Sequence, residues 1–178
     1  MNRRGRHISG RFLCLAALLL ASGFCMGYTY DYSGDRDDSL LTCDKLRWTG
    51  QSTAATACYA SLLSTSDSAY IRAEAQWALG DLKTANSLFG QAVAAEPDNP
   101  KVRTRWGYLY VQTFQFGDAA GLFQEALGIN PDYQPARIGF AAASTAQFSG
   151  GGGDALLDIL EDNVENLEAL LILSKLYL

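Results

Sequence analysis

Apolar side chains recur in this chain with the spacing of one helical face, and the whole pattern returns after 34 residues. Ala85, Phe89 and Ala92 fall on one stripe of a helix, where the small residues let a neighbouring helix approach and the ring fills the space between them. The same residue types stand 34 positions further along, at Ala119, Phe123 and Ala126. The pattern predicts two similar helices, each packed closely against another.

Proline follows each of these stripes. Pro97 and Pro131 stand five residues after the last alanine of their stripe, and the fixed φ of proline ends one helix and starts the next turn. The alternation of helix and turn predicts a stack of helical hairpins. A period of this length is typical of repeat proteins, whose units bury their apolar faces against their neighbours.

Residues 101–133 form the most regular unit of the pattern. The residues that recur in a known order are Trp106, Gly107, Tyr110, Ala119, Phe123, Ala126 and Pro131. This order resembles the tetratricopeptide repeat, although Arg103 stands where that pattern has its first Trp and Trp106 stands where it has Leu. The resemblance implies an all-α, right-handed superhelical solenoid of antiparallel helix hairpins, with about three to three and a half repeats.

The pattern divides the chain into successive units. Gly50 precedes Ala55 by five residues as Gly80 precedes Ala85, which predicts a degenerate first hairpin at residues 39–65. The repeats that follow are expected at residues 66–99, 100–133 and 134–166. A run of glycines at residues 150–153 predicts a flexible joint inside the last of them.

Residues 167–178 are rich in Leu and Ile and match the first helix of an incomplete repeat. Such a helix exposes an apolar face unless another surface covers it. We therefore expect self-association through this helix, docking on the preceding hairpin, or continuation of the repeats in a longer protein.

Two cysteines lie at equal distances from the turn of the first predicted hairpin. Its helices are expected near residues 39–48 and 53–63, so Cys43 and Cys58 stand on opposite arms of the hairpin. Residues at equal depth in an antiparallel hairpin face each other at about the separation that a disulfide needs. The alternative is a pair of small buried thiols.

The N-terminus has the pattern of an export signal. Four arginines precede an apolar run at residues 12–21, which small residues follow, so residues 1–27 read as a signal peptide. The uncharged stretch is also long enough for an uncleaved membrane anchor. Either reading places the chain in the periplasm or cell envelope, where an oxidising environment favours the cysteine bridge. Residues 28–38 are expected to form a flexible acidic segment.

Removal of this leader changes the charge and the chemistry of the chain. Four of the 14 basic residues and His7, which is the one histidine, leave with it, while all 19 acidic residues remain, so the net charge becomes 10 minus 19, or −9. Nucleic acid is not expected as a partner, because no basic stripe is left to neutralise phosphates. Without histidine, neither a catalytic triad nor an imidazole metal site can form, so we expect no enzyme activity, metal or cofactor.

The resemblance also implies a binding groove lined by the first helix of each hairpin. The residues that match groove positions are Tyr70, Glu74, Trp77, Lys101, Thr104, Arg105, Tyr108, Ile138 and Ala142. The aromatic side chains could anchor a peptide, and Lys101 and Arg105 could engage a carboxylate. Alternatively, Trp77 and Tyr108 pack one hairpin on the next.

These features together predict an exported interaction scaffold or adaptor that binds a peptide or helix of an envelope protein in its groove. The alternatives are the N-terminal regulatory or substrate-recruiting region of a longer exported enzyme whose catalytic domain lies beyond residue 178, and a purely structural solenoid.

Overall fold

The computed structural model describes residues 36–147, 152–163 and 166–176. In these ranges the chain forms nine α-helices and no strand. The helices are α1 (Asp38–Trp48), α2 (Ser52–Thr65), α3 (Ala69–Leu79), α4 (Leu82–Ala95), α5 (Pro100–Gln112), α6 (Phe116–Ile129), α7 (Gln134–Ala146), α8 (Gly152–Asp162) and α9 (Leu167–Leu176). The expected leader at residues 1–27 and most of the acidic segment lie outside the described residues.

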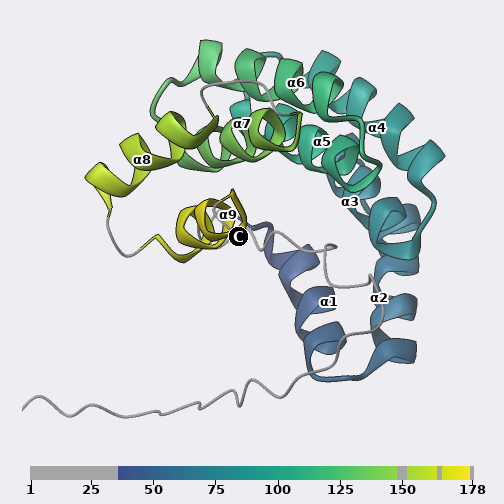
Figure 1. The fold of residues 1–178 in the computed structure, drawn as a ribbon. Helices are drawn as coiled ribbons and strands as arrows, with labels where there is room; N and C mark the ends of the chain where they lie inside the picture. The colour runs from purple at the N-terminus through teal and green to yellow at the C-terminus, as the bar shows by residue number, and fades with distance from the viewer. Residues whose placement is uncertain (1–35, 148–151, 164–165, 177–178) are drawn as a thin grey trace, which may run out of the picture.

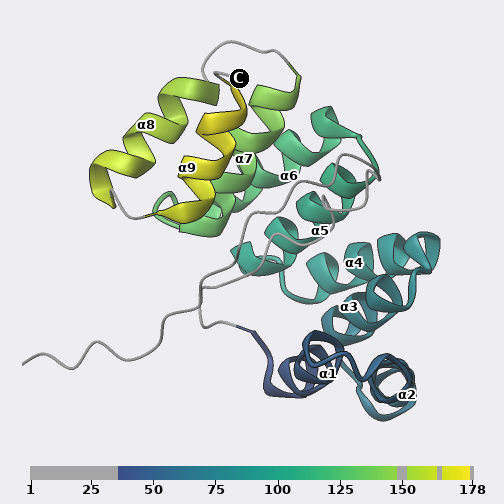
Figure 2. The same ribbon diagram turned by 60° about the horizontal axis from the view of Figure 1, so that its bottom comes forward.

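The helices are arranged as a curved stack of antiparallel hairpins (Figure 1). Each helix packs against the next along the chain, and α5 with α7, and α7 with α9, also contact each other. Odd-numbered helices lie along the inner side of the curve and even-numbered helices along the outer side (Figure 1). A turned view follows the row from the α1–α2 hairpin to α8 and α9 (Figure 2). The predicted all-α solenoid is therefore confirmed.

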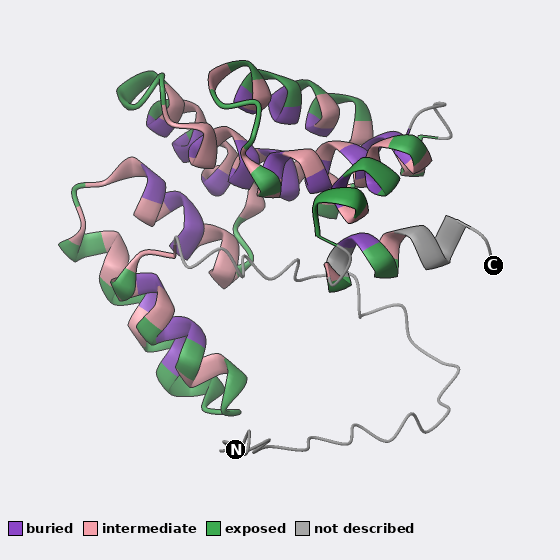
Figure 3. Cartoon of the chain, turned by 90° about the vertical axis from the view of Figure 1, so that its left-hand side faces the viewer, coloured by how far each residue is buried: buried purple, intermediate pink, exposed green. Residues whose placement is uncertain are grey.

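The hydrophobic core is spread along the stack, between the helix layers (Figure 3). One cluster joins the first two hairpins to α5, a second surrounds Phe123, and a third joins α7, α8 and α9. The stripe residues predicted from the sequence, including Ala85, Phe89, Ala119 and Phe123, are fully buried. Each hairpin thus depends on its neighbours for burial, as expected of a repeat protein.

Two glycines make room for the ring of Phe123. A Cβ atom added at Gly107 of α5 would lie 2.8 Å from the Phe123 ring, and one added at Gly139 of α7 would overlap that ring even more closely. The ring of α6 is thus held between the backbones of two inner helices. This contact explains how α5, α6 and α7 approach each other so closely.

The turn inside each of the first three hairpins has a left-handed residue at a fixed position. Gly50 and Gly80, which precede their stripe alanines by five residues, have φ values of +78° and +90°. Phe114 occupies the equivalent position in the next hairpin with φ of +60° and is 72% exposed. A bulky residue in this region costs about 1 kcal/mol. The geometry of the hairpin thus fixes this conformation even where glycine is missing.

Parts of the two segments that the sequence predicts to be flexible belong to the described structure. Gly152 and Gly153 belong to the first turn of α8, and a Cβ atom at Gly152 would come within 2.8 Å of the backbone nitrogen of Thr145. Only residues 150 and 151 of the expected joint lie outside the described residues. At the other end, Arg36 is held by ion pairs, and Asp37 caps α1 by accepting a hydrogen bond from the Ser39 backbone nitrogen at 2.9 Å.

The packing around Phe123 gives the first prediction. Gly139→Ala should lower the free energy of unfolding by about 1–3 kcal/mol, because the new methyl group overlaps a buried ring that cannot move aside. Gly128→Ala, in an open position of α6, is the matched control and should raise the free energy of unfolding by up to about 1 kcal/mol. Urea denaturation followed by circular dichroism measures both, and equal effects of the two changes would contradict this account.

Candidate functional site

A buried carboxylate lies between the inner helices α3 and α5 and the residues that precede α1. Glu74 of α3 is 2% exposed and accepts two hydrogen bonds from the guanidinium of Arg105 on α5, at 2.6 and 2.9 Å. Arg36, which precedes α1, donates a further hydrogen bond to the same carboxylate at 2.6 Å. Glu74 therefore ties together three segments that lie far apart in the sequence.

Arg36 extends this network into the first hairpin. Its Nε donates to Asp44 of α1 at 2.8 Å, and Asp44 in turn accepts a hydrogen bond from the hydroxyl of Tyr59 on α2. The guanidinium of Arg47 donates to the same Tyr59 hydroxyl at 2.6 Å and lies 4.8 Å from the ring centroid. The network thus runs from α2 through α1 and α3 to α5.

The charges in this network stabilise one another. Burial alone would raise the pKa of Glu74, but the guanidinium groups of Arg105 and Arg36 outweigh it and lower the pKa from 4.5 to about 2. Burial would likewise lower the pKa of Arg36 and of Arg105, yet the carboxylates raise both above the ordinary value. Burial, together with the hydrogen bond to Asp44, raises the pKa of Tyr59 to about 12. The Glu74 carboxylate and the guanidinium groups of Arg36 and Arg105 therefore remain charged at neutral pH.

A pocket of about 560 Å³ opens beside this network, where α1, α3 and α5 begin. Its lining residues are Arg36, Asp37, Asp38, Ser68, Tyr70, Ile71, Glu96, Asn99 and Lys101. The Lys101 ammonium lies 5.3 Å from the centroid of the Tyr70 ring. The hydrogen bond from the Ser39 hydroxyl is the main cause that lowers the pKa of Asp37, and the Lys101 charge contributes. The pocket thus presents two cationic side chains, carboxylates and an aromatic ring together.

The structure brings two of the predicted groove residues, Tyr70 and Lys101, into this pocket. Three others are used internally, which corrects the expectation that they face a ligand. Glu74 and Arg105 are buried as an ion pair, and the Thr104 hydroxyl, 1% exposed, donates to the Pro100 carbonyl of its own helix at 2.8 Å. Glu74 and Arg105 neutralise each other and are shielded from solvent, so neither charge is available to a ligand in the groove.

The remaining predicted groove residues pack between hairpins to different extents. Tyr108 is buried edge-on against Phe123, with its hydroxyl donating to the Pro135 carbonyl at 3.0 Å, and Ile138 is buried with α8 and α9. Trp77 is partly buried against Phe89, and its indole donates to Gln112. Ala142 is half-buried. The alternative that these aromatic residues pack one hairpin on the next therefore holds for both: Trp77 of α3 contacts α5, and the Tyr108 hydroxyl of α5 reaches Pro135 of α7.

Sequence reasoning missed Arg36 and Asn99. Asn99 caps α5 through a hydrogen bond from the Lys101 backbone nitrogen at 3.0 Å, and its position just before Pro100 is a helix-start signal that could have found it. Arg36 gave no such signal, because it lies among aspartates in a segment with no periodic pattern. Its role follows only from the packing of α1 beside α3.

The two cysteines of the first hairpin meet as predicted. Cys43 of α1 and Cys58 of α2 have Cα atoms 5.4 Å apart and sulfur atoms at bonding distance. Cys43 is fully buried beside Leu40 and Ala55, whereas Cys58 is partly buried. The disulfide would fasten the two helices that supply Asp44 and Tyr59 to the ion network.

No group of histidine, cysteine and acidic side chains in the described ranges has the arrangement of a metal site. Among the helices that the structure describes, none is long and apolar enough to cross a membrane.

Comparison with known proteins supports the fold. No protein-family model matches the sequence, and no curated protein is similar to it in sequence at a significant level. Solved structures do match. A tetratricopeptide repeat protein from Parabacteroides merdae is 19% identical with a TM-score of 0.62, over 78% of this chain and 56% of the other. The chain therefore has a tetratricopeptide-like fold.

Two further solved structures of this fold belong to proteins that are described as binding peptides. The second tetratricopeptide domain of human RPAP3, in complex with an HSP70 peptide, is 18% identical with a TM-score of 0.58, over 62% of this chain and 93% of that domain. YrrB, described as having an unusual peptide-binding site, is 18% identical with a TM-score of 0.54, over 82% of this chain and 78% of its own. Identities this low show the fold alone.

The buried network gives the second prediction. Glu74→Gln should lower the free energy of unfolding by about 3–5 kcal/mol at pH 7, because it leaves the Arg105 guanidinium buried without a compensating charge and removes one of the two carboxylates that hold Arg36. Asp162→Asn is the control: it breaks the exposed Arg137–Asp162 ion pair and should cost less than about 1 kcal/mol. Urea denaturation of the wild-type chain and of the two variants measures the change in the free energy of unfolding.

The pH dependence of stability tests the same carboxylate. Because the pKa of Glu74 is lower in the folded chain than in the unfolded chain, its contribution is complete above about pH 4.5 and is lost as the pH falls towards 2. The contribution is at most about 3 kcal/mol, from the shift of roughly two and a half pKa units. The Glu74→Gln protein should therefore lose less stability over this range, and parallel pH profiles would contradict the assignment.

Proposed function

We propose that this chain is an exported interaction scaffold that binds a peptide or helix of an envelope protein at its concave face. The observation that carries the proposal is the pocket where the inner helices α1, α3 and α5 begin, named the concave pocket from here on. It combines Tyr70 and Lys101 with the side chains of Ser68 and Asn99, which cap α3 and α5. A peptide lying across these helix ends would contact segments of the chain that only the solenoid brings together.

The ion network beneath the pocket supports this role. Arg36 forms part of the pocket wall and is held by two carboxylates, Asp44 and Glu74. A wall that is fixed before the ligand arrives reduces the ordering cost of binding. The peptide complex described for one protein of the same fold and the peptide-binding site described for another agree with such a use.

The charges of the pocket suggest which peptides fit. Lys101 offers an ammonium group to an acidic side chain or a C-terminal carboxylate, while Asp37, Asp38 and Glu96 favour a basic group nearby. A purely acidic peptide would meet three carboxylates, and the Arg105 charge is already neutralised by Glu74. We therefore propose a segment of mixed charge with an acidic group at the position of Lys101.

Charge reversal at the pocket tests the proposal. Lys101→Glu should weaken capture of an envelope partner at least tenfold, because it replaces the cation that faces the acidic group of the peptide. Lys83→Glu makes the same change at an exposed position of α4 and should leave capture unchanged. The measurement is affinity capture from envelope extract, followed by titration of the captured protein's binding segment against each variant.

Two outcomes would contradict binding at the pocket. One is equal capture by the wild-type chain and the Lys101→Glu variant. The other is an equal loss with Lys83→Glu, which would show that net charge alone governs the association. Circular dichroism of both variants checks that each is folded.

Export and the Cys43–Cys58 bridge can be tested together. Chain recovered from the cell envelope should lack residues 1–27 if a signal peptidase removes them, and should retain them if they form an anchor. Its Cys43 and Cys58 peptides should appear as one linked pair that separates on reduction, because the compartment is oxidising. Mass spectrometry after alkylation measures both features. Recovery only from the cytoplasm, with both thiols alkylated, would contradict export.

A further inference from the structure

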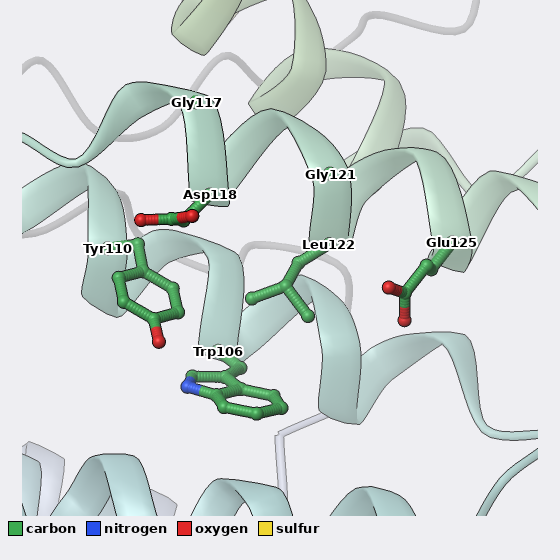
Figure 4. Close-up of a pocket in the computed structure, with 7 residues that line it drawn as sticks. All are labelled: Trp106, Tyr110, Gly117, Asp118, Gly121, Leu122 and Glu125. Carbon is green, nitrogen blue, oxygen red and sulfur yellow. The ribbon is translucent and has the colours of Figure 1, made fainter.

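A second pocket, of about 310 Å³, lies between α5 and α6 (Figure 4). Its lining residues are Trp106, Tyr110, Gly117, Asp118, Gly121, Leu122 and Glu125. The Trp106 indole also reaches α4, where its Nε1 donates to Asn86 at 2.7 Å. The cleft is therefore formed by the inner helix α5 and the outer helix α6, and it shares no lining residue with the concave pocket.

Two stacked rings form the floor of this outer cleft. The centroids of Trp106 and Tyr110 are 6.0 Å apart, with ring planes inclined by 27°. The hydrogen bond to Asn86 fixes the indole, and both side chains remain partly exposed. Aromatic faces held in this way attract a cation that lies over them, and Trp is the most effective side chain for this.

Two carboxylates flank the floor. Asp118 and Glu125 are exposed on α6 and stand seven residues apart, which is about 10 Å along a helix. Glu125 accepts a hydrogen bond from Arg103 at 3.1 Å, but its own side chain is 60% exposed while that of Arg103 is 13% exposed. A second nitrogen of Arg103 donates to the Pro97 carbonyl. The charged side chains most exposed around the cleft are therefore the carboxylates of Asp118 and Glu125.

The side of the cleft formed by α6 carries few side chains near these carboxylates. Gly117 and Gly121 stand one turn apart on α6. A Cβ atom at Gly121 would meet no other atom within 4 Å, whereas one at Gly117 would lie 3.2 Å from the Gln147 side chain. Helix propensity alone would favour alanine over glycine there by about 1 kcal/mol. The missing side chains keep the aromatic floor accessible from solvent.

We infer that the outer cleft binds basic side chains of a protein partner, with arginine placed over Trp106 and Tyr110 and paired with Asp118 or Glu125. Arginine suits this arrangement because its planar guanidinium both stacks on rings and pairs with carboxylates. This surface is separate from the concave pocket, so the inference does not rest on the proposed function. A partner with two basic residues about 10 Å apart would engage both carboxylates.

The probe for this site is the peptide acetyl-Arg-Gly-Gly-Arg-amide, whose arginines span about 10 Å when extended. Addition of the peptide should shift the NMR signal of the Trp106 indole N–H in a saturable way, and the half-saturation concentration should rise with salt. The matched peptide with citrulline in place of arginine keeps the shape without the charge. It should bind at least tenfold more weakly.

Variants separate the cleft from the rest of the surface. Gly121→Leu should abolish the shift by covering the rings, while Gly128→Leu, in an equally open position of the same helix but outside the cleft, should leave it intact. The double variant Asp118→Asn and Glu125→Gln should weaken binding about tenfold. Lys101→Glu should have no effect, which keeps this test independent of the concave pocket.

Three outcomes would overturn the inference. The first is no saturable shift with the arginine peptide. The second is equal binding of the citrulline peptide, which would indicate an apolar or polar occupant instead of a cation. The third is equal loss of binding in the Gly121→Leu and Gly128→Leu proteins, which would place the peptide elsewhere on α6.

Discussion

The arrangement of the first three hairpins depends on one buried carboxylate and the two guanidinium groups that hold it. Glu74 contributes its charge from α3, Arg105 from α5 and Arg36 from the start of α1. Removing charges from water is expensive, so such a cluster is stable only when every member keeps its partners. This requirement sets how α1, α3 and α5 meet, and their meeting ends form the concave pocket. The hydrophobic stripes bring hairpins together, whereas the charges specify the relative position of these three segments.

Close packing plays the corresponding role in the second half of the stack. Phe123 fills the space between Gly107 and Gly139, so that a single ring of an outer helix touches the backbones of two inner helices. The curvature of the solenoid follows from such local contacts, because the described residues bury their apolar side chains in clusters between neighbouring helices and not in one central core. The C-terminal helix α9 ends the described stack with Leu167 and Leu171 exposed. The self-association expected through this helix stays a prediction.

The two faces of the solenoid differ in their chemistry. On the inner face, Glu74 and Arg105, which the sequence suggested for ligand binding, pair with each other inside the protein. Lys101, Tyr70 and several helix caps remain beside the pocket. On the outer face, aromatic rings of α5 lie accessible between carboxylates because glycines of α6 leave them uncovered. A repeat protein can present separate surfaces in this way, since each is built from adjacent hairpins alone.

The sequence by itself determined the helical hairpins, their period and the facing cysteines, because stripes, prolines and turn glycines act over one or two helical turns. Ala85, Phe89 and Pro97 are sufficient to place a helix and its end, and Cys43 and Cys58 follow from the symmetry of one turn. Only the tertiary structure decided which groove residues remain available. Glu74 and Arg105 are 31 residues apart, and nothing local distinguishes a charge that faces a ligand from one that faces a neighbouring helix. Arg36 completes their burial from a segment without any periodic signal, because its position depends on where α1 packs.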